Sequence, residues 1–296
     1  MDAGVHLPQI DFAETPLDGM HLAEVVDAAR DLGFIAFSAN DHLTFPRPWA
    51  DGLVLLAAAS ARAGSLELVT SAALPVLRGA RAYAAAMLTL DRLAPGRVIA
   101  GVGPGSSRVD YSLADVPWDE RWPRFDAALR ILHDEFAGDA GRPRLPLWVA
   151  SWGSPAGLDR VVRFGDGWLA SAFHTTPAEF GAARSSLALE CAGRGRPEPP
   201  HALVTMWTWI TESPTVAERV LTDLVAPGLG RDPETLRDRV CIGSASACAE
   251  LLSAYAAQGC RRVHFWPVAD EVAQLGWLAH DVLPLVEEPP GSSGHG

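Results

Sequence analysis

The chain has 296 residues, of which 48% are hydrophobic, and this length and composition suit one large α/β domain with a well-filled core. Its 24 basic and 36 acidic side chains give a formal net charge of −12, which argues against a nucleic-acid partner because phosphate backbones require a basic face. All 24 basic side chains are arginines, so the chain has no lysine for Schiff-base chemistry or for a Walker-type phosphate loop.

The cysteines and the apolar segments bear on where the protein acts. Cys191, Cys241, Cys248 and Cys260 fit no CxxC or zinc-ribbon spacing, and their mostly apolar surroundings indicate reduced core thiols in a cytoplasmic protein. The N-terminal segment has no charged stretch ahead of an apolar run, so we expect no signal peptide. No apolar stretch reaches the roughly 18 residues of a membrane-spanning helix, so no membrane partner is predicted.

Short apolar runs alternate with amphipathic stretches from the start of the chain. The first half has predicted strands at 4–8, 34–38, 66–73 and 97–102, and predicted helices at 20–32, 51–63 and 81–93. Gly33 stands where a glycine commonly ends a helix. Each strand is thus followed by a helix, as in a parallel sheet.

The second half repeats this alternation. Strands are predicted at 145–150, 166–170, 201–211 and 262–266, and helices at 121–136, 154–164, 177–191 and 246–258. The region 214–239 is helical but irregular, and 269–285 closes the chain. Eight strands alternating with helices predict a (β/α)8 TIM barrel, one domain over residues 1–288, with a disordered tail at 289–296.

In a parallel barrel the functional residues lie where the strands end. Asp41 and His42 follow the second predicted strand within the hexapeptide Ser-Ala-Asn-Asp-His-Leu. An imidazole there can take up or give a proton near neutral pH, and a neighbouring carboxylate could orient it. Asn-Asp is also ordinary turn chemistry, so a solvated turn is the alternative.

A glycine-rich run, Gly-Val-Gly-Pro-Gly at 101–105, follows the fourth predicted strand. It lacks the third spaced glycine of a dinucleotide fingerprint, and no helix begins directly after it. The pattern favours close approach of the backbone at Gly103 and Gly105 to a flat ligand. Asp110, farther along the loop, is a candidate second acid, and a solvated loop acid is the alternative.

The segment after the fifth predicted strand is the strongest candidate for a phosphate site. Ala150, Ser151, Trp152 and Gly153 lead to Ser154, which suits a helix N-cap, and the proline that follows suits the first turn. The exposed amides of a helix N-terminus bind anions without any lysine. Plain capping of the helix is the alternative.

Histidines and tryptophans give two further indications. The nine histidines show no HxH or HExxH spacing, so no metal site is predicted. The ten tryptophans exceed what core packing usually uses, and several fall at predicted strand ends. Most are expected in the core, with a few lining an aromatic pocket that binds a ring.

Four segments together resemble luciferase-like flavin and deazaflavin oxidoreductases, in particular the branch that uses coenzyme F-420. They are SANDHL at 38–43, the stretch from Arg78 that includes TLDRLAPGR at 89–97, GVGPGSS at 101–107, and WVASWGSP at 148–155 with GDGW at 165–168. The TLDRLxxGR stretch followed by GVGPG is the most specific, and the likeness extends over about residues 4–286.

The resemblance implies a homodimeric barrel with the cofactor ring in its mouth and the cofactor phosphate near Ser151 to Ser154. Relatives carry a non-proline cis peptide at the end of the third strand, which falls at Ser71-Ala72 here and would support the ring. The Asp-His pair is frequent in F-420-dependent relatives, so the likeness adds Asp41 to the cofactor site.

The same likeness implies roles for the two candidate catalytic residues. In relatives that oxidise sugar phosphates, a histidine is the base and a glutamate on the strand-four loop is the acid; here His42 and Asp110 hold these positions. The tryptophan near that histidine is replaced by Pro46, with Trp49 nearby. The lysine anchors for a substrate phosphate have no counterpart, which makes a sugar phosphate a doubtful substrate.

The sequence therefore predicts an oxidoreductase that transfers a hydride between coenzyme F-420 and a small organic substrate. An FMN-dependent monooxygenase that uses oxygen and reduced flavin is the first alternative. A non-catalytic flavin-binding barrel is the second, and a metal-dependent hydrolase is disfavoured by the histidine spacing.

Overall fold

The barrel strands of this chain are apolar runs in which most residues are buried. The four residues of β2 (Ala36–Ala39) and the five of β4 (Val98–Val102) are all buried. A strand that is covered on both faces belongs in a parallel sheet, where helices cover one side and the barrel interior the other. The computed structural model describes residues 1–10, 12, 17–138, 141 and 143–287.

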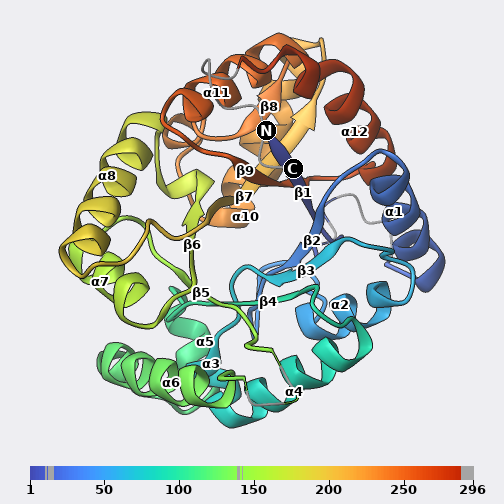
Figure 1. Cartoon of the computed structure of the whole chain (residues 1–296). Helices are drawn as coiled ribbons and strands as arrows, with labels where there is room; N and C mark the ends of the chain where they lie inside the picture. Colours follow the sequence, from blue (N-terminus) through green and yellow to red (C-terminus); the bar gives the residue numbers. More distant parts are fainter. Residues whose placement is uncertain (11, 13–16, 139–140, 142, 288–296) are drawn as a thin grey trace.

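Eight parallel strands close into a barrel, which confirms the predicted fold (Figure 1). Around the barrel, each strand from β1 to β6 pairs with the next, β6 pairs with β7, β7 with β9, and β9 with β1. The other strands are β1 (Asp2–His6), β3 (Glu67–Thr70), β5 (Leu147–Ala150), β6 (Gly167–Ser171), β7 (His201–Ile210), β8 (Cys241–Gly243) and β9 (Arg262–Pro267).

A ninth strand, β8, was not predicted and lies outside the ring. The ten residues of β7 extend past its pairing with β6, and its last residues pair with β8. Three residues are too few to show a period in the sequence. The region before β8 was predicted to be helical but irregular. It contains α9 (Pro214–Arg219), a π-helical turn (Val220–Val225) and α10 (Ala226–Leu229).

Helices surround the barrel, and side-chain caps fix where several of them begin (Figure 1). Asp18, Asp51 and Ser154 accept hydrogen bonds from the first-turn N–H groups of α1, α2 and α7. Gly33, with a φ of +82°, follows the end of α1 as expected. The helices are α1 (Gly19–Asp31), α2 (Gly52–Ser60), α3 (Pro75–Arg78), α4 (Ala80–Leu93), α5 (Arg108–Leu113), α6 (Arg121–Glu135), α7 (Pro155–Phe164), α8 (Pro177–Gly193), α11 (Ala245–Ala257) and α12 (Glu271–Trp277).

The buried hydrophobic residues form three clusters. The largest fills the space between strands and helices, and the second fills the barrel interior. The third joins residues after β1 and β9 to β7 and to the segment 220–240. The interior cluster consists of Ala36, Val69, Ile99, Trp148, Leu169, Ala202 and Val204. The barrel is therefore a packed core and not a pore, and ligands have access only at its ends.

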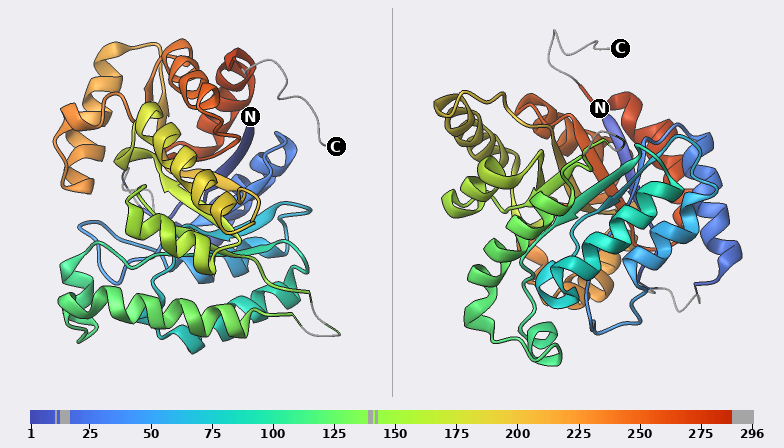
Figure 2. Two further views of the ribbon diagram at one scale, coloured as in Figure 1. Left: turned by 60° about the vertical axis from the view of Figure 1, so that its left-hand side comes forward. Right: turned by 60° about the horizontal axis from the view of Figure 1, so that its bottom comes forward.

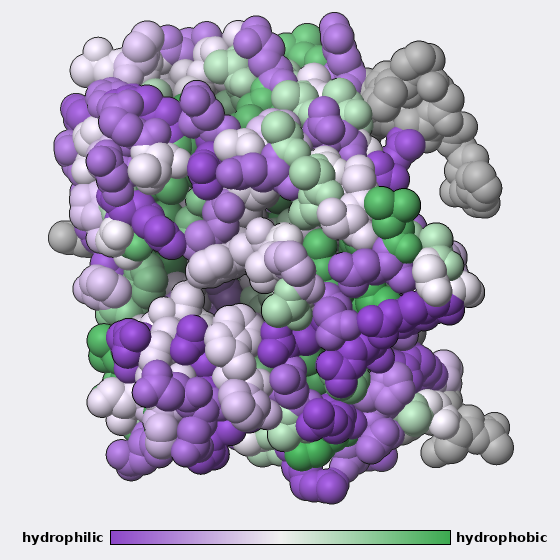
Figure 3. Space-filling model, turned by 90° about the vertical axis from the view of Figure 1, so that its left-hand side faces the viewer, coloured by the Kyte–Doolittle hydropathy of each residue, from purple (hydrophilic) through white to green (hydrophobic). Residues whose placement is uncertain are grey.

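Two observations bear on a membrane partner: the hydropathy of one outer face, and the length and apolar character of the described helices. The face over α7 and α8 is mainly hydrophilic, with hydrophobic side chains in small scattered groups (Figure 3). Within the described ranges, no helix combines the length and the apolar character that crossing a membrane requires. The predicted tail at 289–296 lies outside the described residues.

Candidate active site at the barrel mouth

The predicted site residues follow four neighbouring strands and meet on one side of the barrel mouth. His42 follows β2, Ser71 and Ala72 follow β3, Gly103 follows β4, and Ser151 follows β5. These strands pair in that order and in parallel, so their carboxyl ends lie at one end of the barrel (Figure 2). This is the end at which barrel enzymes carry their active sites.

His42 is held by Asp110, which is 68 positions away in the sequence. The Nδ1 of His42 lies 2.7 Å from Oδ2 of Asp110, and the N–H of Thr44 donates to Oδ1 at 3.0 Å. An ionised carboxylate only accepts, so the Nδ1–H of His42 donates to it. The His42 side chain is 20% exposed and that of Asp110 only 1%. This contact engages Nδ1 and does not involve the second ring nitrogen of His42, Nε2.

Asp110 lies on a short helix, and the alternative of a solvated loop acid is wrong. Ser107 caps α5, and its Oγ accepts the N–H of Asp110 at 3.1 Å. The sequence signal was a serine three positions before an acidic residue, which is a typical helix start. The helix turns Asp110 inward toward His42, so its carboxylate is 1% exposed and does not face solvent.

Asp41 does not orient His42, contrary to one interpretation of the adjacent pair. Its carboxylate accepts from Nε of Arg78 at 2.6 Å, from the second guanidinium nitrogen at 2.8 Å, and from the N–H of Leu74 at 3.0 Å. Arg78 also donates to Asp51. These bonds raise the pKa of Arg78, with the Asp41 hydrogen bond as the largest cause. Asp41 therefore ties the loop after β2 to α3.

The peptide bond between Ser71 and Ala72 is cis, as the resemblance implied. The side-chain oxygen of Asn40 accepts the N–H of Ala72 at 3.0 Å and that of Asp41 at 2.9 Å. The Oγ of Ser71 lies 3.2 Å from Nε2 of His6 inside the barrel. The side chains of His6 on β1 and of Asn40 after β2 thus hold this segment at the mouth.

Ala72 of this peptide, Gly103 and Ala150 lie side by side and form a shelf of small residues. A Cβ built on Gly103 would lie 3.4 Å from the Cβ of Ala72 and 3.5 Å from that of Ala150. Gly105 has a φ of +82°, a conformation that favours glycine. No side chain on the shelf reaches beyond a methyl group, so a planar ring can approach the backbone there.

The start of α7 offers backbone donors, though not all of the predicted ones. The N–H of Ser151 donates to the carbonyl of Leu169, and that of Gly153 donates to Oγ of Ser151 at 3.2 Å. The Oγ of Ser154 accepts the N–H of Gly157 at 3.3 Å. Two of the amides predicted to hold a phosphate are therefore engaged within the protein, that of Ser151 by the sheet and that of Gly153 by the Ser151 side chain. Ser154 and Ala156 hold the first-turn N–H groups that the helix itself leaves open.

Trp152 projects outward from this loop and stacks on His174. The two rings are parallel within 16° and their centroids are 3.8 Å apart. His174 lies 3.0 Å from Oγ of Ser171 through Nδ1 and 2.7 Å from Arg231 through Nε2. Burial, followed by the charge of Arg231, lowers the pKa of His174 to about 3. The imidazole is therefore neutral and accepts from the arginine.

Aromatic rings also contact His42, and the sequence predicted this kind of surrounding only in general terms. The rings of Trp49 and Phe45 have centroids 4.8 Å and 5.5 Å from that of His42. Trp266 lies 5.9 Å from Trp49 and stacks on both His6 and Trp207. The sequence indicated an aromatic pocket, but not which tryptophans form it.

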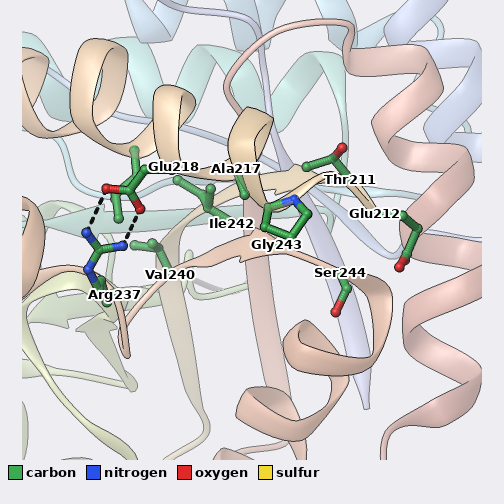
Figure 4. A pocket seen from close by; sticks show the side chains of 11 residues that line it. Thr211, Glu212, Ala217, Glu218, Arg237, Val240, Ile242, Gly243 and Ser244 are labelled. Atoms are coloured by element: carbon green, nitrogen blue, oxygen red, sulfur yellow. Dashed lines mark hydrogen bonds and ion pairs between the residues drawn. The ribbon is translucent and has the colours of Figure 1, made fainter.

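Two other candidate features among the described residues are a metal site and a cavity near β8. The described residues contain no group of three or more histidine, cysteine, aspartate or glutamate side chains that could hold a metal ion. A cavity of about 310 Å³ lies near β8, between α9 and the residue that caps α11. Its lining includes an ion pair between Glu218 on α9 and Arg237 (Figure 4). Its described lining contains none of the predicted site residues.

Comparisons with known proteins identify the family and similar folds. A sequence model of the family described as luciferase-like monooxygenase matches residues 7–262. An F-420-dependent glucose-6-phosphate dehydrogenase from Beutenbergia cavernae is 33% identical over 170 residues, which are 48% of this chain and 49% of that protein. The chain thus spans about half the length of the curated relatives it matches.

Two solved structures share the whole fold at low sequence identity. An F-420-dependent secondary alcohol dehydrogenase, solved with an F-420–acetone adduct, has a TM-score of 0.80 and 16% identity, covering 97% of this chain and 99% of its own. The oxygenating constituent of 3,6-diketocamphane monooxygenase from Pseudomonas putida, solved with FMN, has a TM-score of 0.73 and 14% identity, covering 98% and 99%.

Proposed function

Because this chain belongs to the luciferase-like monooxygenase family, we propose that it is an oxidoreductase that transfers a hydride between the deazaflavin coenzyme F-420 and a small organic substrate. The observation that carries the proposal is the 2.7 Å hydrogen bond between His42 and Asp110 at the barrel mouth. The F-420-dependent proteins among its relatives and structural neighbours support the choice of coenzyme.

The residues at the mouth fit a coenzyme that has a flat ring and a phosphate. A Cβ built on Gly103 would meet only the methyl groups of Ala72 and Ala150 within 4 Å, so this shelf is suited to the approach of a ring. The N–H groups of Ser154 and Ala156 at the start of α7 are suited to hold the phosphate, because a helix N-terminus favours an anion. These donors take the place of the Ser151 amide in the binding site.

The chain's own residues handle the proton. When bound, the deazaflavin ring gives or takes a hydride at its C5 position. The Nε2 of His42 takes the substrate's proton in one direction and returns it in the other, because Nδ1 is committed to Asp110. Asp110 is a positioning residue, since it fixes the tautomer and the orientation of the imidazole but is itself buried.

An FMN-dependent monooxygenase is the second candidate. The FMN-bound structural neighbour favours it, and the shelf and the start of α7 would suit FMN as well as F-420. A non-catalytic flavin-binding barrel is the third candidate. It predicts that the wild-type protein binds a flavin or deazaflavin but turns over no substrate with either coenzyme.

Titration of the purified protein with F-420 and, separately, with FMN tests the coenzyme. We expect saturable binding of F-420, followed by its absorbance. Tight binding of FMN alone would overturn the F-420 assignment. Turnover that requires oxygen and supplied reduced FMN would establish the monooxygenase. His42→Ala should abolish turnover without changing the fold measured by circular dichroism, and unchanged turnover would remove His42 from the mechanism.

We further propose that the enzyme is a cytoplasmic homodimer. The four free cysteines are buried, which supports a reducing compartment. The family resemblance supports the dimer, and sedimentation equilibrium tests it. We expect neither nucleic acid nor a membrane as a partner, given the net charge of −12.

A further inference from the structure

A cavity of about 490 Å³ lies beside the barrel mouth, and its described lining includes neither His42 nor Asp110. Its walls come from the segments that follow β1, β2 and β9, together with the start of α1 and of α12. This volume is in the range of small-molecule sites. The described lining consists of Pro8, Gln9, Ile10, Phe12, Leu17, His21, Pro48, Trp49, Ala50, Val268, Ala269, Asp270 and Glu271.

The cavity is joined to the proposed proton-exchange site through Trp49. This side chain lines the cavity, and its ring lies edge-on to the ring of His42 with a centroid separation of 4.8 Å. The loop that carries Trp49 is fixed from below, because Gln9 donates to the carbonyl groups of Asn40 and Ala50 at 2.9 Å. A molecule in the cavity can therefore contact Trp49, whose ring in turn contacts the ring of His42.

The walls of the cavity are mostly apolar, and its ionisable groups favour no anion. Ile10, Phe12 and Trp49 belong to the third hydrophobic cluster. Asp270 and Glu271 place two carboxylates in the lining against one imidazole, that of His21, which lies 3.1 Å from Glu271. Glu271 is only 8% exposed. Asp270 is exposed, so an anion would meet like charge chiefly at Glu271, where water screens the repulsion least.

Arginines do not reverse this balance. No arginine is among the described residues that line the cavity. Arg47 lies close by, but its guanidinium packs over the ring of Phe12 at 5.3 Å and donates to the Phe12 carbonyl. With no lysine in the chain, a phosphate or carboxylate on the substrate would find no cation in the described lining.

We propose that this cavity receives the body of the substrate, and that the substrate is an uncharged, largely apolar molecule and not a phosphorylated or carboxylate-bearing one. The inference rests on the proposed function only for the chemistry at His42. The occupancy of the cavity and its preference for uncharged molecules can be measured without the coenzyme.

Isothermal titration calorimetry of the full chain with two matched probes tests the preference. 4-Methylcyclohexanone and 4-oxocyclohexanecarboxylate share a six-membered ring and a ketone and differ in charge. We expect the uncharged ketone to bind at least tenfold more tightly. Glu271→Gln should reduce this ratio, because it removes a carboxylate and keeps the shape of the side chain. Glu24→Gln, the same change on the exposed face of α1, should leave the ratio unchanged.

A second variant tests whether the cavity itself is the binding site. Ala269→Phe fills it, and we expect the affinity for the uncharged ketone to fall at least tenfold, while the affinity for F-420 stays within twofold. Equal binding of both probes by the wild type, or unchanged ketone binding by this variant, would overturn the inference. Failure of F-420 to bind a protein that still discriminates between the probes would overturn the proposed coenzyme alone.

Discussion

Breaking the buried ion pair between Asp41 and Arg78 should be among the most destabilising single changes at the barrel mouth. Asp41 is 4% exposed, and Arg78→Met removes two hydrogen bonds of 2.6 and 2.8 Å to its carboxylate. Only the N–H of Leu74 then remains to stabilise a buried charge. Removing one partner of a buried pair costs about 3–5 kcal/mol, so we expect a loss of that size in the free energy of unfolding.

Urea denaturation measures this loss, and two comparisons isolate its cause. Adding Asp41→Asn to Arg78→Met should cost less than the sum of the two single changes, because no uncompensated charge remains. Arg237→Met, which breaks exposed pairs with Glu218 and Glu234, should change stability little. If Arg78→Met costs no more than Arg237→Met, the reasoning from burial is wrong.

Three further predictions concern the imidazoles and the shelf. Asp110→Asn should lower turnover by about two orders of magnitude or more, because an amide NH2 facing Nδ1 moves the imidazole proton of His42 to Nε2. The ¹⁵N shifts of that ring report the tautomer, and an unchanged tautomer would contradict the positioning role. Burial lowers the pKa of His264 to about 3, so the folded chain keeps it neutral while the unfolded chain takes up a proton below about pH 6.5. Stability should therefore be highest above pH 6.5 and fall toward pH 3, by up to about 2 kcal/mol at pH 5 from this residue. His264→Phe should flatten that fall in urea midpoints measured from pH 7 to 5, and an equally steep fall would refute the assignment. Gly103→Val should raise the dissociation constant of F-420 at least tenfold by covering the shelf, whereas Gly193→Val, where a Cβ meets nothing within 4 Å, should leave it unchanged.

Local signals in the sequence were sufficient for the order of elements and for the edges of several helices. The apolar run of β4 and the serine-proline start of α7 lie where the sequence predicted them. Both can be seen within a few residues, as a continuous apolar run in β4 and as a side chain that caps its own first turn in α7. The strand β8 was missed because three residues are too few to show a pattern, and only its pairing with the end of β7 defines it.

The sequence by itself determined that a strand ends at Asp41-His42 and that a glycine-rich turn and a helix start follow the fourth and fifth strands. Only the tertiary structure decided which side chains meet: His42 with Asp110, Asp41 with Arg78, and the cavity walls from the segments after β1, β2 and β9. The physical reason is that backbone preferences act over a few residues, whereas these contacts form only when strands distant in the sequence pair, β2 with β3, β3 with β4, and β1 with β9.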